Sequence, residues 1–128
     1  MTIKEVSEKF QITQDTLRYY ERIGMIPAVS RTPGGIRDYN EKDLSWVELA
    51  ICMRSAGLPV EAMIEYVKLF AQGDSTIEAR LQLLKDQREV LLEQKKKMDS
   101  TIERLDYKIS RYEEAMETGK LTWNKEQN

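Results

Sequence analysis

The sequence predicts a mainly α-helical protein: a winged helix-turn-helix head with a small β-hairpin wing, followed by a long antiparallel coiled-coil dimerisation helix. Three observations lead to this fold class. Two short helix signals lie close together near the start, a turn-rich segment with alternating side chains follows, and a heptad repeat fills much of the second half of the 128-residue chain. We expect a head over residues 1–74, a coiled-coil helix over residues 75–117 and a tail over residues 118–128.

The composition is typical of a soluble, helix-rich chain, with 41% hydrophobic and 33% charged residues. No apolar run has the length of a signal-peptide core or a membrane span, and the single cysteine, Cys52, excludes an internal disulfide. We therefore expect a cytoplasmic protein with no membrane partner. The formal net charge of −2 gives no compositional support for nucleic-acid binding, so a case for DNA depends on where the charges lie.

Capping residues indicate the first two helices. Thr2 and Glu5 have the spacing of a capping box, and Thr13 is a suitable N-cap for a second helix that carries Asp15 in its first turn. Gly24 is suited to end that helix. Two short helices separated by two or three residues indicate a helix-turn-helix.

The next segment, "IPAVSRTPGGIRDYN", predicts a small β-hairpin because alternating residues flank the turn signal "TPGG". Alternation along a strand places Arg37 and Tyr39 on one face and turns Ile36 to the other, which we expect to be the core side.

Two further helices complete the predicted head. Asn40 and Asp43 form a capping pair for the third helix, and "SAGLP" separates it from a fourth helix that ends at Gly73. The apolar positions expected to face inward recur at helical spacing. They are Leu44, Val47, Ile51, Leu58, Met63, Val67 and Phe70.

From Thr76 onward, apolar residues recur alternately four and three positions apart, without an intervening proline or glycine before Gly119. This heptad seam extends over about 40 residues, which corresponds to roughly 60 Å of helix. Such a stripe must be buried, most simply against a second copy of the chain. The seam comprises Ile77, Leu81, Leu84, Arg88, Leu91, Lys95, Met98, Ile102, Leu105, Ile109, Tyr112 and Met116; we expect dimer contacts above all at Leu84, Leu91, Met98, Ile102, Leu105 and Ile109.

The two charged seam residues favour an antiparallel dimer. Arg88 and Lys95 occupy the same heptad position, so a parallel, in-register dimer would place each of them against its own copy. An antiparallel arrangement places each beside an apolar neighbour and lets the charged heads reach water.

Residues suited to DNA contact lie on the second helix and on the predicted wing. The second helix of a helix-turn-helix presents its early residues to the major groove, and with Leu17 inward, Thr16 and Tyr19 project outward. Arg18 can reach a flanking phosphate, and a tyrosine hydroxyl can bond a phosphate or a base edge. Arg37 and Tyr39 repeat this pair of a cation and a phenol on the wing. The alternative is that the arginines are simply solvated.

The opening "TIKEVSEKFQITQDTLRYYERIGMIPAVSRTPGGIRDYNEKDL" resembles the MerR-type transcriptional regulators. The resemblance is carried by the "LRYYE-x-x-G" pattern of a recognition helix, followed by Arg31, Gly35, Arg37 and Tyr39 in the order and spacing of a wing. It continues through residues 53–59 and the long helix, and so covers about 115 residues, which is far more specific than an isolated helix-turn-helix.

This resemblance implies a homodimer that binds an operator within a promoter whose two recognition elements are spaced too far apart. Effector binding then makes the dimer bend and untwist the double-stranded DNA, so that RNA polymerase can use the promoter. The resemblance implies DNA contacts by Arg18, Tyr19, Arg37 and Tyr39, extended by Thr16 and Arg31.

The resemblance also suggests what is sensed. Metal-responsive relatives carry cysteines where this chain has Asp74 and Ser75, and the chain has no histidine, so we expect neither a metal nor another cofactor. Only twelve residues follow Met116, too few for the ligand domain of drug-sensing relatives. Cys52 resembles the single sensor cysteine of a branch that responds to reactive aldehydes and other electrophiles. A buried, inert cysteine is the alternative.

Other classes of function explain less of the sequence. The chain has no histidine, nucleophile motif or phosphate-binding loop, so we do not expect an enzyme. A coiled-coil interaction module without DNA binding would explain the heptads but leave the predicted wing without a purpose. A regulator with a non-covalent ligand near Trp46, Met63, Tyr66 and Phe70 also stays open. The sequence does not decide the effector, the target genes, the balance of activation and repression, or the role of the tail.

Overall fold

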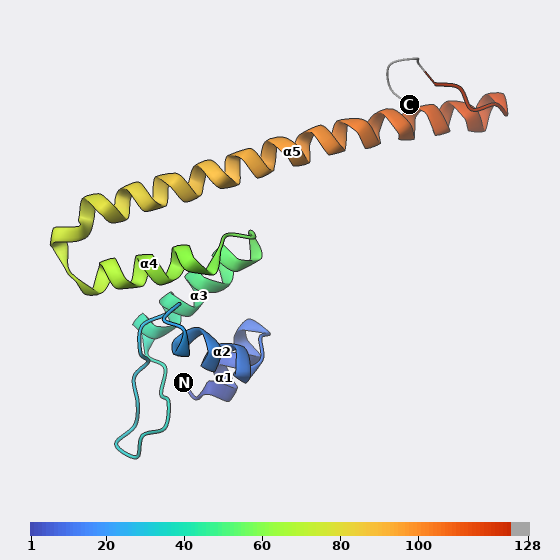
Figure 1. Ribbon diagram of the computed structural model, residues 1–128. Coiled ribbons are helices and arrows are strands. Elements are labelled where there is room, and N and C mark those ends of the chain that lie inside the picture. Colours follow the sequence, from blue (N-terminus) through green and yellow to red (C-terminus); the bar gives the residue numbers. More distant parts are fainter. Residues whose placement is uncertain (124–128) are drawn as a thin grey trace. The chain divides into compact units, whose positions relative to one another are not determined.

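The computed structural model describes residues 1–123, in which the chain divides after Arg88 into two compact units that are described separately here. The described part is mainly helical, as predicted (Figure 1). Its elements follow one another as α1 (Ile3–Phe10), α2 (Gln14–Arg22), α3 (Glu41–Ser55), α4 (Val60–Ala71), the short 3-10 helix η1 (Asp74–Thr76) and α5 (Ile77–Thr118).

The helix-turn-helix forms where the capping residues predict it. The Thr2 and Glu5 side chains make both hydrogen bonds of a capping box at the start of α1, and Thr13 caps α2. Between the two helices, Gln11 takes the left-handed conformation, with φ of 55°, which reverses the chain within a few residues. Val6 of α1 and Leu17 of α2 are fully buried, so the two helices pack through their apolar faces.

The predicted β-hairpin is wrong in form. Within residues 1–123 the segment between α2 and α3 holds no strand, only a single antiparallel bridge between Arg31 and Arg37. Two further backbone bonds close the loop, from Thr32 N to Ile36 O (2.8 Å) and from Asp38 N to Ser30 O (2.7 Å). A hairpin of two such short sides, with no third strand beside it, is at best marginally stable as a ladder. We call residues 30–38 the wing loop.

The expected direction of the wing side chains is also wrong. Ile36, predicted to face the core, is 67% exposed, whereas Tyr39 is 2% exposed and Arg37 is half-buried. Arg37 and Tyr39 therefore share a side, as alternation requires, but this side faces the head. Alternation determines which residues lie together and not which of the two faces meets the core.

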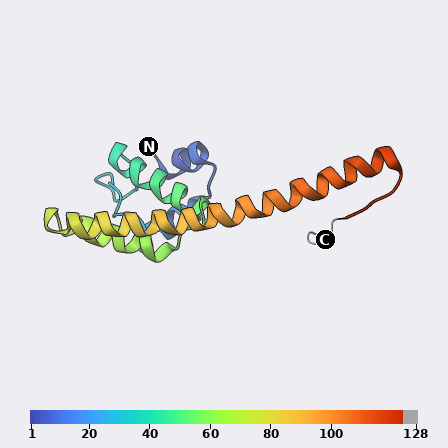
Figure 2. The same cartoon turned by 90° about the horizontal axis from the view of Figure 1, so that it is seen from above.

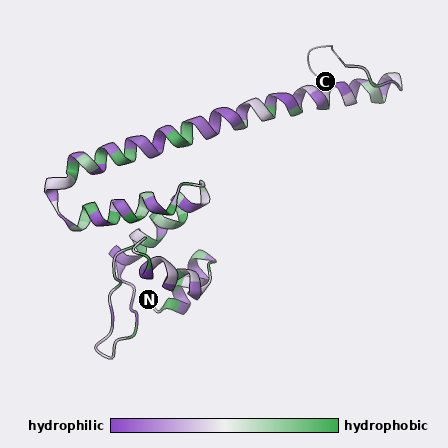
Figure 3. Ribbon diagram, in the orientation of Figure 1, coloured by the Kyte–Doolittle hydropathy of each residue, from purple (hydrophilic) through white to green (hydrophobic). Residues whose placement is uncertain are grey.

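Helices α3 and α4 follow in the first unit, and both carry a mixture of hydrophobic and hydrophilic residues (Figure 3). Asn40 and Asp43 form the predicted capping box, and Asp43 also accepts a hydrogen bond from Ser30 N (3.0 Å), which ties the wing loop to the start of α3. Val47 and Met63 are buried as expected. Phe70, expected to face inward, is 49% exposed and lies with its edge toward Trp46, at 5.1 Å between ring centroids.

Helix α5 is one long helix (Figure 2) of 42 residues. It begins at a polar junction. The Thr76 hydroxyl donates to Leu69 O (2.6 Å), and Arg80 donates to Thr76 Oγ1 (3.0 Å) and to Gly73 O (3.1 Å). These bonds connect carbonyl groups in and just after the last turn of α4 to the start of α5. None of the described helices is both long enough and apolar enough to pass through a membrane.

In the second unit, residues 119–123 return along the last turns of α5. Gly119 has a φ of +75°, which permits the reversal, and Arg111 Nε donates to Thr122 O (2.8 Å). Trp123 packs against Tyr112 (5.9 Å between centroids), with Lys108 Nζ 4.7 Å from its ring. The part of the predicted tail after Trp123 lies outside the described residues.

Candidate nucleic-acid interface

The N-terminal turns of α2 carry three of the predicted contact residues. Thr16 is half-buried, and its hydroxyl lies 2.8 Å from that of the cap residue Thr13. Arg18 is exposed and donates to Asp15 (3.0 Å) and to Gln14 (3.3 Å), one turn earlier on the same helix. Asp15 is 96% exposed, so this ion pair is fully hydrated and stabilises the helix little. Arg18 can therefore exchange its partner for a phosphate at small cost.

Tyr19 and Tyr20 have different environments although they are adjacent. Tyr19 is 41% exposed, and the Arg22 guanidinium lies over its ring at 5.4 Å from the centroid. Tyr20 is 9% exposed, and burial raises the pKa of its hydroxyl. Tyr19 thus presents a phenol and a nearby cation at the surface of α2, whereas Tyr20 belongs to the core.

Glu21 connects α2 to the wing loop, a role that the sequence pattern does not predict. Its carboxylate accepts a hydrogen bond from Arg37 Nε at 2.7 Å and one from the Val29 backbone N–H at 2.9 Å. A terminal nitrogen of Arg31 lies 3.5 Å from the same oxygen that Arg37 contacts. The Glu21 side chain is only 10% exposed. Glu21 stands at the end of the "LRYYE" pattern, and this was the one feature of the sequence that pointed to it. Helical spacing alone did not show which partners Glu21 has.

The two wing arginines are accessible to different degrees. The Arg31 side chain is 42% exposed and also donates to Gly35 O (3.0 Å), within the loop. The Arg37 side chain is 24% exposed. The wing loop therefore places two guanidinium groups beside the C-terminal end of α2, on elements joined through one carboxylate.

Tyr39 requires a correction. Its side chain is 2% exposed, its hydroxyl is buried without a hydrogen-bond partner among residues 1–123, and burial raises its pKa. The exposed position that the sequence analysis expected for this phenol is wrong, because the side of the loop that it shares with Arg37 packs on the head. Its backbone N–H bonds Met1 O (2.7 Å).

Cys52, the predicted sensor, lies near the end of α3 with an exposed side chain. Its carbonyl accepts from the Ser55 hydroxyl (2.8 Å) and from Ala56 N (3.2 Å), close to the point where the helix ends. The buried thiol considered as an alternative is therefore not observed in this chain. Among the described residues no cluster of histidine, cysteine, aspartate or glutamate has the makings of a metal site.

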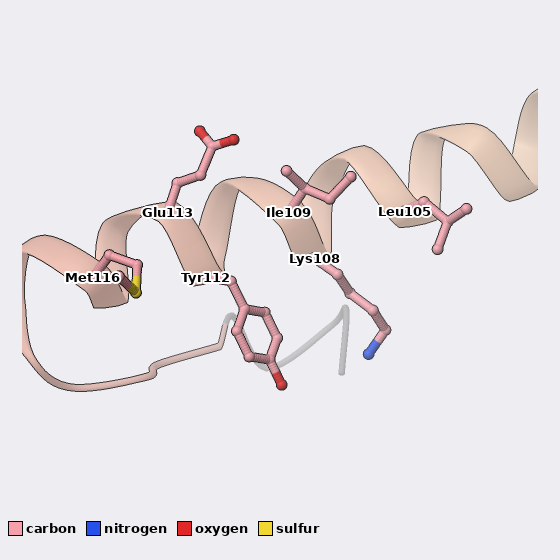
Figure 4. Close-up of a pocket in the computed structure, with 6 residues that line it drawn as sticks. All are labelled: Leu105, Lys108, Ile109, Tyr112, Glu113 and Met116. Atoms are coloured by element: carbon pink, nitrogen blue, oxygen red, sulfur yellow. The ribbon is translucent and has the colours of Figure 1, made fainter.

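The predicted dimer residues form an exposed apolar stripe, and α5 contains no buried residue. Their exposure ranges from half-buried Leu91 to Met98 at 64%, with Leu84 at 42%, Ile102 at 49%, and Leu105 and Ile109 at 53% each. Toward the end of α5 the stripe borders an open groove of about 310 Å³ (Figure 4). Lys108 and Tyr112 point to the side along which the returning chain lies, and Glu113 points away from it.

A smaller pocket lies in the first unit between α3 and α4. It has a volume of about 160 Å³ and is lined by Ser45, Trp46, Leu49 and Tyr66. The Trp46 and Tyr66 rings are 5.7 Å apart between centroids. This pocket includes two of the four residues near which the sequence analysis allowed for a small apolar ligand.

Comparison with known proteins relates this geometry to a family. The model of the family described as "MerR family regulatory protein" matches residues 2–39, which contain α1, α2 and the wing loop. The HTH-type transcriptional regulator AdhR of Bacillus subtilis is 54% identical over 93 residues, which are 73% of this chain and 66% of AdhR. An HTH-type regulator of Haemophilus influenzae, itself uncharacterized, is 31% identical over 94% of this chain and 89% of its own length.

Two solved structures are similar over nearly the whole chain. A MerR family transcriptional regulator from Listeria monocytogenes has a TM-score of 0.89 and 44% identity, with coverage of 93% of this chain and 90% of that one. HiNmlR, a MerR family regulator lacking the sensor domain and bound to promoter DNA, has a TM-score of 0.82 and 31% identity, with coverage of 94% and 95%. Since the helix-turn-helix, the wing arginines and these similarities agree, the chain belongs to the MerR family of transcriptional regulators.

Proposed function

We propose that this protein binds double-stranded promoter DNA through α2 and the wing loop, as a homodimer joined by α5. One observation carries the proposal: Arg18 and Tyr19 are exposed on α2, and Arg31 and Arg37 lie on a loop joined to the same helix through Glu21. The promoter DNA in the HiNmlR complex supports it, because that protein is similar to this chain over nearly its full length.

The distribution of charge favours binding through individual arginine–phosphate contacts and not through long-range attraction between the whole protein and DNA. The chain has a net charge of −2, so long-range attraction to DNA is weak, and affinity must come from local contacts. Thr16 and Tyr19 can reach base edges or sugars, while Arg18, Arg31 and Arg37 neutralise phosphates. Such contacts fix the protein on the duplex, and sequence is then read partly through the energy of deforming the DNA.

The exposed stripe on α5 supports the proposed dimer. Side chains such as Leu105 and Ile109, each 53% exposed, are too many and too regularly spaced to stay in water. A second copy presents the same stripe, and the antiparallel arrangement keeps Arg88 and Lys95 away from their own copies. Dimeric binding gives two heads and hence a two-fold symmetric operator.

We further propose that the dimer controls transcription by distorting its operator for RNA polymerase, with Cys52 as the sensor of reactive aldehydes or related electrophiles. The exposed thiol supports this role, as does the similarity to AdhR. With an aldehyde, the Cys52 sulfur forms a bond to the carbonyl carbon, and the thiol proton ends on the carbonyl oxygen, which gives a hemithioacetal. The effector must bind the DNA-distorting conformer more tightly to shift the equilibrium.

A non-covalent ligand in the pocket at Trp46 and Tyr66 is a second candidate for the effector. The pocket volume of about 160 Å³ lies below the usual range for ligand sites, so it suits only a small apolar molecule.

Two experiments test these proposals. The first measures binding of wild type and Arg37→Ala to the protein's own promoter, together with their dimerisation by sedimentation. Weaker DNA binding with an unchanged dimer is expected, and unchanged DNA binding would favour a coiled-coil interaction module.

The second experiment is in vitro transcription from the same promoter with wild type and Cys52→Ser, with and without formaldehyde or methylglyoxal. Activation only with wild type would support the thiol sensor. Equal responses of the two proteins would remove Cys52 from the mechanism and favour the non-covalent ligand.

A further inference from the structure

Glu21 contacts the wing loop at two arginines and also contacts Val29, the residue before the loop, and each contact restrains a different group. One carboxylate oxygen accepts from Arg37 Nε (2.7 Å) and lies 3.5 Å from Arg31, and the other accepts from Val29 N (2.9 Å). With 10% of its side chain exposed, Glu21 is shielded from water. By contrast, the side chain of Asp15, which pairs with Arg18, is 96% exposed. Shielding strengthens the hydrogen bonds that a carboxylate makes.

The contact leaves most of the Arg37 guanidinium available. Arginine has five N–H donors, and among residues 1–123 Arg37 uses only Nε, toward Glu21. Arg31 is held from two sides, by Glu21 and by Gly35 O (3.0 Å). Both guanidinium groups are therefore fixed from the protein side while other N–H groups remain for an anion.

We propose that Glu21 is a positioning residue for DNA binding, which orients Arg37 and Arg31 toward phosphates and restrains the entry to the wing loop through Val29, the residue before it. This inference rests on the proposed DNA contacts of these two arginines. A guanidinium that is already oriented loses less conformational freedom when it meets a phosphate, so its contact contributes more to affinity.

The competing role for Glu21 is that of a counter-ion that DNA must displace. The two roles predict opposite results. If Glu21 is a counter-ion, Glu21→Gln removes a negative charge close to DNA and tightens binding, whereas the charge-conserving Glu21→Asp leaves it unchanged. If Glu21 positions the arginines, both variants weaken binding, because Gln cannot accept bonds on both sides and Asp is one methylene too short to reach them.

The experiment measures binding of the full-length wild type, Glu21→Gln and Glu21→Asp to a fluorescent fragment of the protein's own promoter, by anisotropy over a series of salt concentrations. We expect both variants to bind about tenfold more weakly, with the slope of log K against log[salt] smaller in magnitude by about 1 to 2. Asp15→Asn is the matched control, since it also removes a carboxylate from an arginine of this surface; it should bind as tightly as wild type or slightly more tightly.

Two further measurements make the outcome specific. Circular dichroism at the assay temperature shows whether each variant is folded. If Glu21 had a purely structural role, its variants would have a lower unfolding midpoint but the same DNA affinity and the same salt slope as wild type. The double variant Glu21→Gln/Arg37→Gln should lose less affinity than the two single losses together, because part of the effect of Glu21 acts through Arg37.

Tighter binding by Glu21→Gln, an unchanged affinity of Glu21→Asp, or additive losses in the double variant would each overturn the positioning role. If wild type itself fails to bind its promoter, the proposed function fails instead.

Discussion

The head and the later part of α5 differ in what holds them together. Residues 1–71 bury a continuous set of apolar side chains, among them Val6, Leu17 and Met63 at 0% exposure. Helix α5 has no buried residue at all in the single chain, although it carries a regular apolar stripe. The head therefore has its own core, whereas the long helix has none in the single chain and depends on the dimer that we propose. The effects of substitutions on stability should therefore differ between the two regions, both in size and in their dependence on protein concentration.

The largest effect should follow from truncating the core of the head. Leu17→Ala removes a fully buried side chain between α1 and α2, and we expect it to lower the free energy of unfolding by about 2–5 kcal/mol. Urea denaturation followed by circular dichroism measures this change. The loss should be the same at every protein concentration at which the dimer persists. A loss below about 1 kcal/mol would show that the head does not depend on this core.

Charges placed on the α5 stripe should act on association instead. Ile102→Glu combined with Ile109→Glu introduces like charges at two positions that are about half exposed in the single chain. We expect the dimer dissociation constant to rise by roughly 100-fold or more, which corresponds to about 3 kcal/mol. Sedimentation equilibrium measures it, with Lys97→Glu, off the stripe, as the control. A dimer that survives the double substitution would place the interface elsewhere.

A smaller effect is expected at the first helix cap. Thr2→Ala removes the hydroxyl that accepts from Glu5 N (3.1 Å), and should cost about 1 kcal/mol in the stability of the head. Thermal unfolding of wild type and variant measures it. The cap is local, so dimerisation should be unaffected, and a changed dissociation constant would contradict the separation of the two regions.

The same cap predicts a dependence on pH. The hydrogen bond from Thr2 N (3.0 Å) holds the pKa of Glu5 below its ordinary value of 4.5. Because the folded state lowers this pKa, the stabilisation is present above pH 4.5 and is lost as the pH falls through the folded value. The difference in unfolding midpoint between wild type and Glu5→Gln should therefore shrink on acidification. If the difference in unfolding midpoint between the two proteins grew at low pH, this prediction would be contradicted.

The smallest effect concerns the returning chain after α5. Trp123→Ala removes a ring that packs on Tyr112 and Lys108, and we expect a loss of about 0.5–1 kcal/mol, since these contacts are largely exposed. Thermal unfolding of wild type and variant, followed by circular dichroism, measures this loss. A large loss together with dissociation would make this segment part of the dimer interface.

The sequence predicted elements whose cause is local or periodic. The caps at Thr2, Thr13 and Asn40 depend on neighbouring residues, and the length of α5 depends on a repeat that nothing interrupts. The sequence was a poorer guide to which side chains pack against the head. Alternation paired Arg37 with Tyr39 but did not show that their side faces the head.

The site was predictable in residue type more than in geometry. Arg18 and Tyr19 could be recognised because helical spacing turns them away from Leu17. Glu21 was missed because its role depends on Val29 and Arg37, which are eight and sixteen residues away and meet it only when the wing loop folds. The exposure of Cys52 likewise depends on how α3 packs, and helical spacing within α3 did not reveal it.

Oxidative footprinting of the dimer with and without its own promoter DNA would show which of the two regions meets DNA. If α2 enters the groove, the oxidation rate of Tyr19, which is 41% exposed in the single chain, should fall several-fold when DNA is added. The rates of Met98 and Tyr112 on α5 should not change. Unchanged oxidation of Tyr19 with protection confined to α5 would contradict DNA binding by the head.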